Sequence, residues 1–214
     1  DPHVKRTRLR PLANKAISVG NAFLILACLL VPCLFLVLTL NTSTVILSFG
    51  ALAVMSAYPF MKRYTHFPQD ILGIAFSWGI PMAFSAGGGS LDATMWLLLV
   101  ANWAWVIAYD TQYAMVDKDD DIKLGLKSTA IIFGKFSRSI IGVLQFFCLG
   151  ILTLLGTSHD FGMVYQISIF IAGLFFLYQH FLLSKATREN YFAAFLNNHW
   201  VGFFIFLGIC GNFL

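Results

Sequence analysis

The chain of 214 residues is 58% hydrophobic and 11% charged, and its mean hydropathy is +0.77. This composition excludes a soluble globular domain and indicates a polytopic membrane protein. The formal net charge of +4 comes largely from basic runs beside apolar segments, so we expect membrane lipid, and no nucleic acid, as a partner. We expect the four cysteines to be small buried hydrophobic residues, because they lie in apolar runs without metal-ligand spacing. They are Cys28, Cys33, Cys148 and Cys210.

Seven apolar segments follow the basic N-terminal stretch, each close to the roughly 20 residues that a bilayer requires. They predict an all-α fold, a polytopic helix bundle of about seven spanning helices that forms one transmembrane domain over residues 1–214. The predicted helices cover residues 18–40, 44–60, 68–86, 93–110, 139–156, 163–183 and 196–214. Short polar breaks between them indicate turns.

The positive charges fall on one side of this predicted bundle. All 14 Lys and Arg residues lie in the N-terminal stretch or in the connections 61–67, 110–138 and 184–195. The alternate connections and the C-terminal end carry none. Because cytoplasmic loops are enriched in Lys and Arg, this pattern predicts a cytoplasmic N-terminal side and a C-terminus on the opposite side of the membrane.

One acidic stretch, residues 110–121, contains five of the ten carboxylates of the chain. On a helix, Asp117 and Asp121 lie about 20° to either side of Asp110. Asp117 and Asp121 form an i,i+4 pair with roughly 5–6 Å between Cβ atoms, so their carboxylates repel unless a cation lies between them. Oxygen ligands without a nearby His or Cys suit Mg²⁺, which commonly keeps positions for substrate phosphates. The pattern predicts a metal and diphosphate site at a membrane surface.

Other interpretations of this stretch are possible. A solvated surface turn is the commonest meaning of an acidic run, but half of the carboxylates here gather at the end of one apolar helix. An EF-hand matches at Asp117, Asp119 and Asp121 but fails at Ile122, where that loop requires Gly. A transporter with an acidic cation site predicts charges near helix centres and inverted repeats. The charges here lie at helix ends, and no repeat is visible.

Two basic clusters accompany the acidic stretch. The first runs through Lys5, Arg6 and Arg10; it suits either anionic lipid or a diphosphate, whose oxygens a guanidinium binds in a fork. The second joins Tyr58 to Lys62 and Arg63. Tyr58 and Lys62 can share a helix face and point into one cavity, although an aromatic belt with positive anchors also explains them.

Several polar residues lie inside the apolar segments. Asp70 begins one of these segments, so we expect a partner for its carboxylate. For the amides, hydrogen bonds between helices are the expected role. These amides are Asn102, Gln145, Gln166 and Gln179.

The stretch Tyr109–Thr129 resembles the second Asp-rich motif of the UbiA superfamily of intramembrane prenyltransferases. The sequences around Lys5-Arg6 and around Tyr58, Lys62 and Arg63 resemble the branch of that family that acts on 4-hydroxybenzoate. The resemblance covers the whole chain. The other membrane family with paired Asp motifs, the CDP-alcohol phosphotransferases, needs a DG-x₂-AR block that this sequence lacks. The resemblance implies a helix bundle in the bacterial inner membrane, with its site facing the cytoplasm and a cavity that opens to lipid.

The activity implied is transfer of a polyprenyl group from polyprenyl diphosphate to the ring carbon ortho to the hydroxyl of 4-hydroxybenzoate, in ubiquinone biosynthesis. The resemblance implies that Mg²⁺ is held by Asp1, Asp117 and Asp121. It implies a diphosphate bound by Lys5, Arg6, Arg10, Lys62 and Arg63. Asp110 would orient the phenol or take its proton, and Tyr58, Lys62 and Arg63 complete the predicted catalytic set. Another aromatic acceptor, such as a naphthoate, a homogentisate or a porphyrin, is the alternative.

The family pattern also implies residues upstream of residue 1. Family members have nine spanning helices and a first motif of the form N-D-x-x-D-x-x-x-D, of which Asp1 would be the last Asp. Two helices and most of that motif would then precede the sequence. We therefore expect the 214-residue chain to insert in membranes but to be inactive until those residues are restored.

Overall fold

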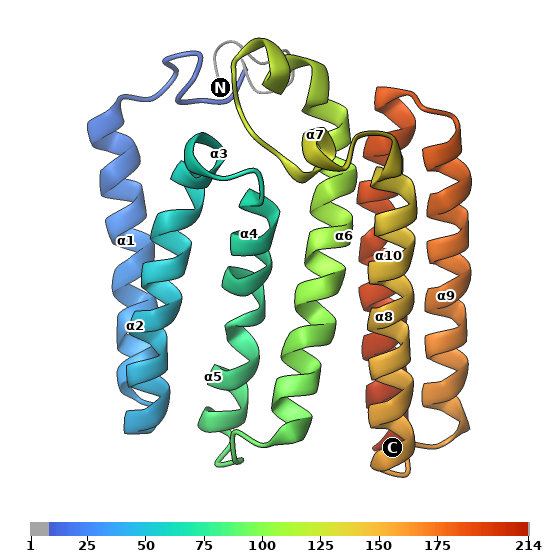
Figure 1. Cartoon of the computed structure of the whole chain (residues 1–214). Coiled ribbons are helices and arrows are strands. Elements are labelled where there is room, and N and C mark those ends of the chain that lie inside the picture. The colour runs from blue at the N-terminus through green and yellow to red at the C-terminus, as the bar shows by residue number, and fades with distance from the viewer. Residues whose placement is uncertain (1–8, 214) are drawn as a thin grey trace.

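The computed structural model describes residues 9–213, which form helices and turns with no strand among them (Figure 1). The elements are α1 Val19–Leu38, α2 Thr42–Ala57, η1 Tyr58–Phe60, α3 Met61–Tyr64, α4 Pro68–Ser77, α5 Gly79–Ala86, α6 Ala93–Lys123, α7 Thr129–Phe133, η2 Gly134–Phe136, α8 Ser137–Ser158, α9 Met163–Ser184 and α10 Arg188–Asn212. Within this described part, six stretches are long and apolar enough to cross a bilayer. The predicted all-α membrane bundle is confirmed.

Helices α4 and α5 together replace the single helix predicted for residues 68–86. Pro81 cannot donate a backbone hydrogen bond to Ser77, and its ring crowds that carbonyl, so the helix is interrupted at Trp78. The indole Nε1 of Trp78 donates to the carbonyl oxygen of Leu47 in α2 at 2.8 Å. The interruption is thus anchored to a neighbouring helix, and α4 with α5 runs the height of the bundle (Figure 1).

The predicted end of the helix at residue 110 is wrong, because α6 continues to Lys123. Ala114 and Val116 remain buried beyond Asp110, so the apolar face of the helix extends through the acidic stretch. The helix then stops at Gly125, whose φ of 66° is a conformation that glycine adopts without strain. Leu126 N donates to the carbonyl of Asp121 at 2.9 Å and Gly125 N to that of Ile122 at 3.2 Å, which is a Schellman cap.

The predicted start of the last helix at residue 196 is also wrong, because α10 begins at Arg188. The Thr187 side chain caps it by accepting a hydrogen bond from Asn190 N at 3.3 Å. The first turn of α10 carries charged and polar residues, which an apolar pattern does not detect. This turn lies at the same end of the bundle as the C-terminal end of α6 (Figure 1).

Helix α6 occupies the middle of the bundle, with α4 on one side and α8 and α10 on the other (Figure 1). Its buried positions are mostly small, which lets neighbouring helices approach closely. Ala101, Ala104, Ala108 and Ala114 are each at most 2% exposed. The site that α6 carries is therefore built on a closely packed central helix.

Buried amides join four helices, as the sequence predicted for Gln145 and Gln179. The Oε1 atom of Gln179 in α9 accepts from Gln112 Nε2 of α6 at 2.9 Å and from Gln145 Nε2 of α8 at 2.8 Å. The Oε1 atom of Gln112 accepts in turn from Asn198 Nδ2 of α10 at 3.0 Å. Because buried amides are costly when unpaired, this network fixes the register of the four helices.

The polar residues predicted to have partners on the α4 side also have them. Asp70 Oδ1 accepts from the indole Nε1 of Trp103 at 2.8 Å, and Asn102 Nδ2 donates to Ser77 Oγ at 3.0 Å. Both contacts join the α4 crossing to α6. The interior polar groups therefore hold α6 from two directions.

Helix α1 lies at the edge of the bundle, where it packs along α2 and has no buried residue of its own (Figure 1). The prediction of buried cysteines is wrong for Cys28 and Cys33, which are exposed on this helix, whereas Cys148 is buried. An apolar groove of about 410 Å³ separates α1 from α2. In a bilayer such a surface is in contact with lipid or with other apolar helices.

The segments rich in cations lie together at one end of the bundle, and the C-terminus lies at the other (Figure 1). We expect a reporter fused after Leu214 and a reporter inserted within residues 118–135 to read out on opposite sides of the membrane. The insertion should read out as cytoplasmic, because its side carries every Lys and Arg. Two reporters on one side would contradict the arrangement of seven crossings, which consists of the six long spans and the α4–α5 pair.

Two helical glycines give a matched test of the packing between α9 and α10. A Cβ atom at Gly208 would collide with the side chain of Ser168, whereas one at Gly150 would meet nothing within 4 Å. Gly208→Ala should cost about 1–3 kcal/mol through overpacking. Gly150→Ala should be neutral or stabilising by up to about 1 kcal/mol, because Ala favours the helix. Thermal unfolding in detergent measures both, and equal melting temperatures would refute this packing.

Candidate active site at the end of helix α6

Three aspartates form one buried face on the C-terminal half of α6. Asp110, Asp117 and Asp121 are 7%, 6% and 1% exposed. The side chain of Asp119, on the opposite face, is 72% exposed. Asp110, Asp117 and Asp121 therefore lie on one helix face, as the sequence predicted, and all three carboxylates point into the protein.

Lys62 lies against this face from α3. Its Nζ atom is 3.0 Å from Asp121 Oδ2, and its charge also acts on Asp110. Tyr58, at the end of α2, is close enough to Asp110 for their charges to interact. The structure thus brings Tyr58, Lys62 and the carboxylates of α6 into one site, although residues 58–64 are far from α6 in sequence.

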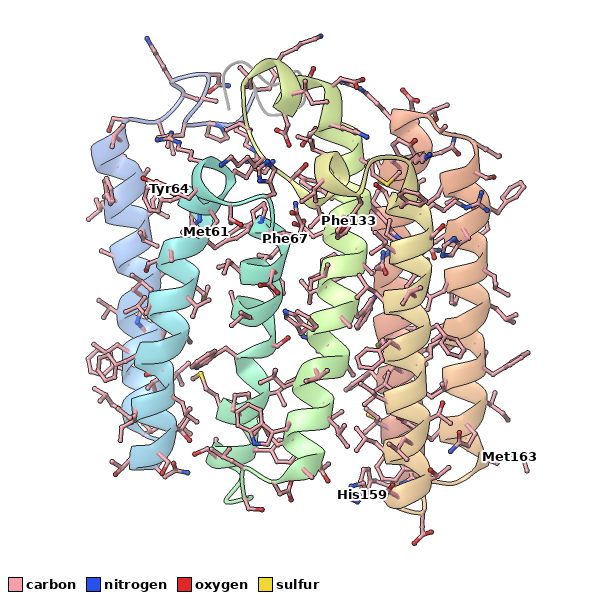
Figure 2. The ribbon with its side chains drawn as sticks, viewed as in Figure 1. Met61, Tyr64, Phe67, Phe133, His159 and Met163 are labelled. Carbon is pink, nitrogen blue, oxygen red and sulfur yellow. The ribbon has the colours of Figure 1, made fainter. Side chains whose placement is uncertain are left out.

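The chain after α6 folds back to close one side of the site. Lys127 N donates to the carbonyl of Lys62 at 3.0 Å. Thr129 N donates to Gln69 Oε1 at 3.0 Å, and the hydroxyls of Thr129 and Thr111 are 2.8 Å apart. The rings of Phe67 and Phe133, labelled in Figure 2, meet edge to face at 6.3 Å. These contacts join α3, α4 and α7 around the buried carboxylates.

Gln69 is a site residue that the sequence did not reveal. It is 2% exposed, and its amide interacts with the carboxylate of Asp110 as well as with Thr129. Its neighbour Asp70 attracted notice as a charge within an apolar segment, whereas a single Gln has no such signal. Only the packing of α4 on α6 shows which of the two residues faces the site.

An open, aromatic-lined cleft of about 490 Å³ lies between α4, α6 and α10. It is lined by Phe76, Trp105, Tyr109, Phe195, Leu196, Asn198, His199 and Gly202. A second cavity of about 320 Å³ shares Phe76 with it and is lined by Tyr58. Tyr109, which lines the cleft, and Tyr58, which lines the second cavity, are both close enough to Asp110 for electrostatic interaction.

The charged site suits a hard divalent cation only in part. Asp117 and Asp121 offer carboxylate oxygens at i,i+4 spacing, and Mg²⁺ commonly uses one or two carboxylates and fills its other positions with water and phosphate. Within residues 9–213, no three or more acidic, His or Cys side chains cluster as a complete metal site. The carboxylate pair therefore fits a cation that a phosphate-bearing ligand shares.

The remaining predicted site residues are less closely placed. Arg63 is exposed beside Lys62, and Arg10 is exposed on the segment that leads into α1. Asp1, Lys5 and Arg6 lie outside the described residues. Of the five cations predicted to bind phosphate, the structure describes Lys62, Arg63 and Arg10. Among these three, only Lys62 is seen in contact with the carboxylates of α6.

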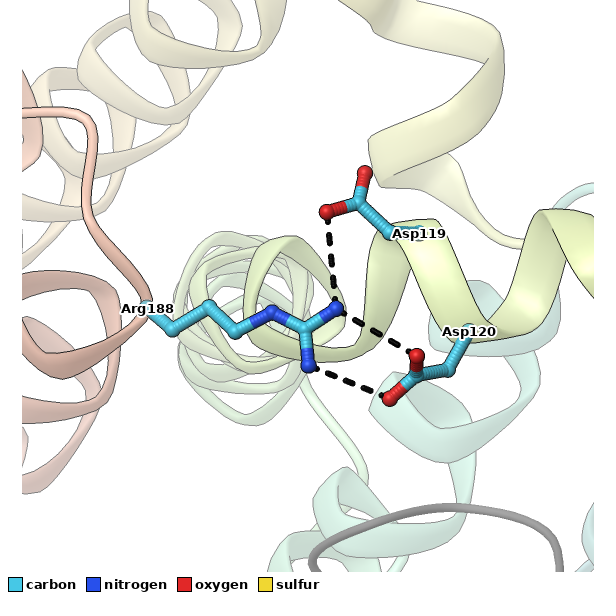
Figure 3. Close-up of polar contacts among 3 residues, drawn as sticks. All are labelled: Asp119, Asp120 and Arg188. Atoms are coloured by element: carbon cyan, nitrogen blue, oxygen red, sulfur yellow. Dashed lines mark hydrogen bonds and ion pairs between the residues drawn. The ribbon is translucent and has the colours of Figure 1, made fainter.

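Asp119 and Asp120 have a partner that the sequence did not predict. Arg188, the first residue of α10, contacts both carboxylates (Figure 3). It is separated from them by almost 70 residues of sequence, so nothing local indicates the pairing. Four acids within five residues of helix do indicate that further cations must come from other elements, and this was the signal available in the sequence.

The chain is similar to curated proteins over almost its whole length. It is 51% identical over 209 residues to a protein of Pseudomonas entomophila (strain L48) named 4-hydroxybenzoate octaprenyltransferase, covering 98% of this chain and 71% of that protein. A protein of the same name from Citrobacter koseri is 49% identical over 214 residues, covering 100% of this chain and 74% of the relative.

Two solved structures share the fold. The apo structure of a UbiA homolog from Aeropyrum pernix K1 matches with a TM-score of 0.83 and 24% identity, over 98% of this chain and 78% of that one. A digeranylgeranylglyceryl phosphate synthase matches with a TM-score of 0.68 and 21% identity, over 97% and 76%. The model of the UbiA prenyltransferase family matches residues 1–208, and the chain belongs to that family.

Proposed function

We propose that this protein transfers a polyprenyl group from polyprenyl diphosphate to 4-hydroxybenzoate, as a step of ubiquinone biosynthesis. The observation that carries the proposal is the buried aspartate face of α6, which lies beside Lys62 and close to two tyrosines that line apolar cavities. Membership of a prenyltransferase family supports transfer chemistry rather than transport. The names of relatives about half identical to this chain favour 4-hydroxybenzoate over other aromatic acceptors.

The charged end of the site would bind the diphosphate. Asp117 and Asp121 would hold Mg²⁺, which when bound neutralises the diphosphate and makes it a better leaving group. Lys62 stands 3.0 Å from Asp121, so its ammonium can contact both the carboxylate and a phosphate oxygen. Arg10 and Arg63 are the other described candidates for the remaining negative charge, since a guanidinium binds phosphate oxygens in pairs.

The acceptor would lie next to Asp110. This carboxylate is 7% exposed and lies close to the Gln69 side chain and to Lys62. It would accept a hydrogen bond from the phenol of 4-hydroxybenzoate, which makes the ring more electron-rich and orients the ortho carbon. The proton lost from that carbon as the new bond forms would also have a nearby acceptor in Asp110.

The prenyl tail would occupy the cleft lined by Trp105, Tyr109 and Phe195. An allylic carbocation forms as the C–O bond of the diphosphate breaks, and aromatic faces attract such a cation. The apolar walls also exclude water, which would otherwise capture it. Because the Lys and Arg residues gather at the same end of the bundle as the site, the site would face the cytoplasm. The protein would form a single domain in a bacterial inner membrane.

The direct test is incubation of membranes that carry the protein with labelled 4-hydroxybenzoate, a polyprenyl diphosphate and Mg²⁺. We expect the natural protein at its full length to form prenylated product, and a chelator to abolish it. We expect the 214-residue chain alone to form none, because the family pattern uses two Asp-rich motifs and this sequence holds only Asp1 of the first. No product from the full-length protein would refute the function, and product from the short chain would show that these two carboxylates suffice.

Variants of the acidic turn test the metal site. Asp117→Ala and Asp121→Ala in the full-length protein should each lower turnover by at least about 100-fold, by removing a group that stabilises the charge of the leaving diphosphate. Asp119→Ala is the matched control, because its side chain is 72% exposed on the opposite face. It should change turnover by less than about threefold. Equal losses in all three variants would contradict the assignment of faces.

A further inference from the structure

The turn of α6 that carries Asp117 and Asp121 also carries Asp119 and Asp120, for which the proposed chemistry has no use. Both contact Arg188 (Figure 3). Arg188 Nη1 is 3.1 Å from Asp120 Oδ2, and Nη2 is 3.3 Å from Asp120 Oδ1 and 3.4 Å from Asp119 Oδ2. A planar guanidinium that meets both oxygens of one carboxylate fixes direction as well as distance.

This end of α6 is electrostatically unfavourable by itself. Four of the last seven residues of the helix are aspartates. The C-terminal end of a helix carries a partial negative charge, which disfavours carboxylates there. Lys62 compensates on the buried face and Arg188 on the other. Lys118 and Lys123 offset part of the charge from within α6. In the proposed reaction Lys62 is shared with the diphosphate, so Arg188 is the cation from a neighbouring helix that stays paired with this turn.

Arg188 is itself held in place. The turn before it includes Ala186 in a left-handed conformation, with φ 52°. The hydroxyl of Thr187 accepts from Asn190 Nδ2 at 2.7 Å and from Asn190 N at 3.3 Å. The first turn of α10 is therefore capped, and its end with partial positive charge lies beside the acidic end of α6. An arginine on such a turn can fix the position of its partner.

We propose that Arg188 is a positioning residue of the metal–diphosphate site. By holding Asp119 and Asp120 it keeps the last turns of α6 helical, and so keeps Asp117 and Asp121 on one face at i,i+4 spacing. Its link to the metal rests on the proposed function, whereas its effect on the helix does not.

The sign of the effect separates positioning from simple charge. Arg188 adds a positive charge near the site, so its removal by long-range electrostatics alone would strengthen the binding of a divalent cation. Loss of helix order would weaken that binding, because the two carboxylates would no longer be held together. A weaker cation affinity in Arg188→Ala can therefore come only from lost positioning.

The test uses Arg188→Ala, Arg188→Lys, Asp120→Asn and the double variant Arg188→Ala/Asp120→Asn in the full-length protein. Lys185→Ala is the control, because this cation lies three residues away and contacts the ring of Phe181 at 4.6 Å. Three measurements are made on each. They are Mn²⁺ binding by electron paramagnetic resonance, hydrogen exchange of the amides of residues 118–124, and prenyl transfer as a function of Mg²⁺ concentration.

Arg188→Ala and Asp120→Asn should each weaken Mn²⁺ binding by about three- to tenfold, at or below the range seen for outer-sphere partners of metal ligands. The Mg²⁺ concentration for half-maximal activity should rise by the same factor, with turnover at saturating Mg²⁺ within about twofold of the starting protein. The amides of residues 118–124 should exchange faster. The double variant should be no worse than either single one, as expected for partners in one interaction.

Arg188→Lys should recover part of the loss, because it keeps the charge but not the fork. The proposal would be overturned if amide exchange in Arg188→Ala is unchanged, or if its Mn²⁺ binding is unchanged or tighter. It would also be overturned if Lys185→Ala shows the faster exchange and weaker Mn²⁺ binding expected of Arg188→Ala. If the exchange and Mn²⁺ results hold but no variant and no starting protein transfers prenyl groups, the proposed function fails and the positioning role stands.

Discussion

Repulsion between carboxylates at the end of α6 is the constraint on which the site depends. Asp117, Asp119, Asp120 and Asp121 share about one and a half turns of helix at the end where the helix dipole already favours cations. No residue of α6 itself can compensate all four. The compensation comes from Lys62 of α3 and from Arg188 of α10, one on each face. The ends of three separate helices are therefore brought together by one cluster of charge.

This cluster has to be presented by a helix that does not shift, and the interior of the bundle supplies that rigidity. Small residues of α6 allow close packing, and the amide of Gln112 links α6 through Gln179 to α8 and α9. Asp70 and Trp103 link it to α4. Because each amide or carboxylate would be costly if left unpaired in an apolar interior, a sliding movement of α6 is strongly disfavoured. The carboxylates thus project from a fixed axis.

Much of this site could be predicted from the sequence, because the informative features are local. The i,i+4 spacing places Asp117 and Asp121 on one face, and the structure buries both while leaving Asp119 exposed. The apolar segments predict the bundle for the same reason. The true length of α6 was missed because its acidic end resembles a loop in composition. Gln69 and Arg188 were missed because their partners are distant in sequence, and only helix packing brings them together.

The repeated aspartates of this turn are not interchangeable copies of one ligand. A helix that presents two carboxylates to a cavity at i,i+4 spacing must be ordered over that whole interval, yet those two carboxylates repel each other and oppose that order. Acids on the opposite face add to this repulsion unless a cation pairs with them. When a cation on a neighbouring helix does so, the ion pair holds the end of the helix in place. Asp120 with Arg188 meets that condition at 3.1 Å. On the proposed role of Arg188, the anchored face keeps the helix ordered, so its loss would loosen the metal pair without removing either ligand.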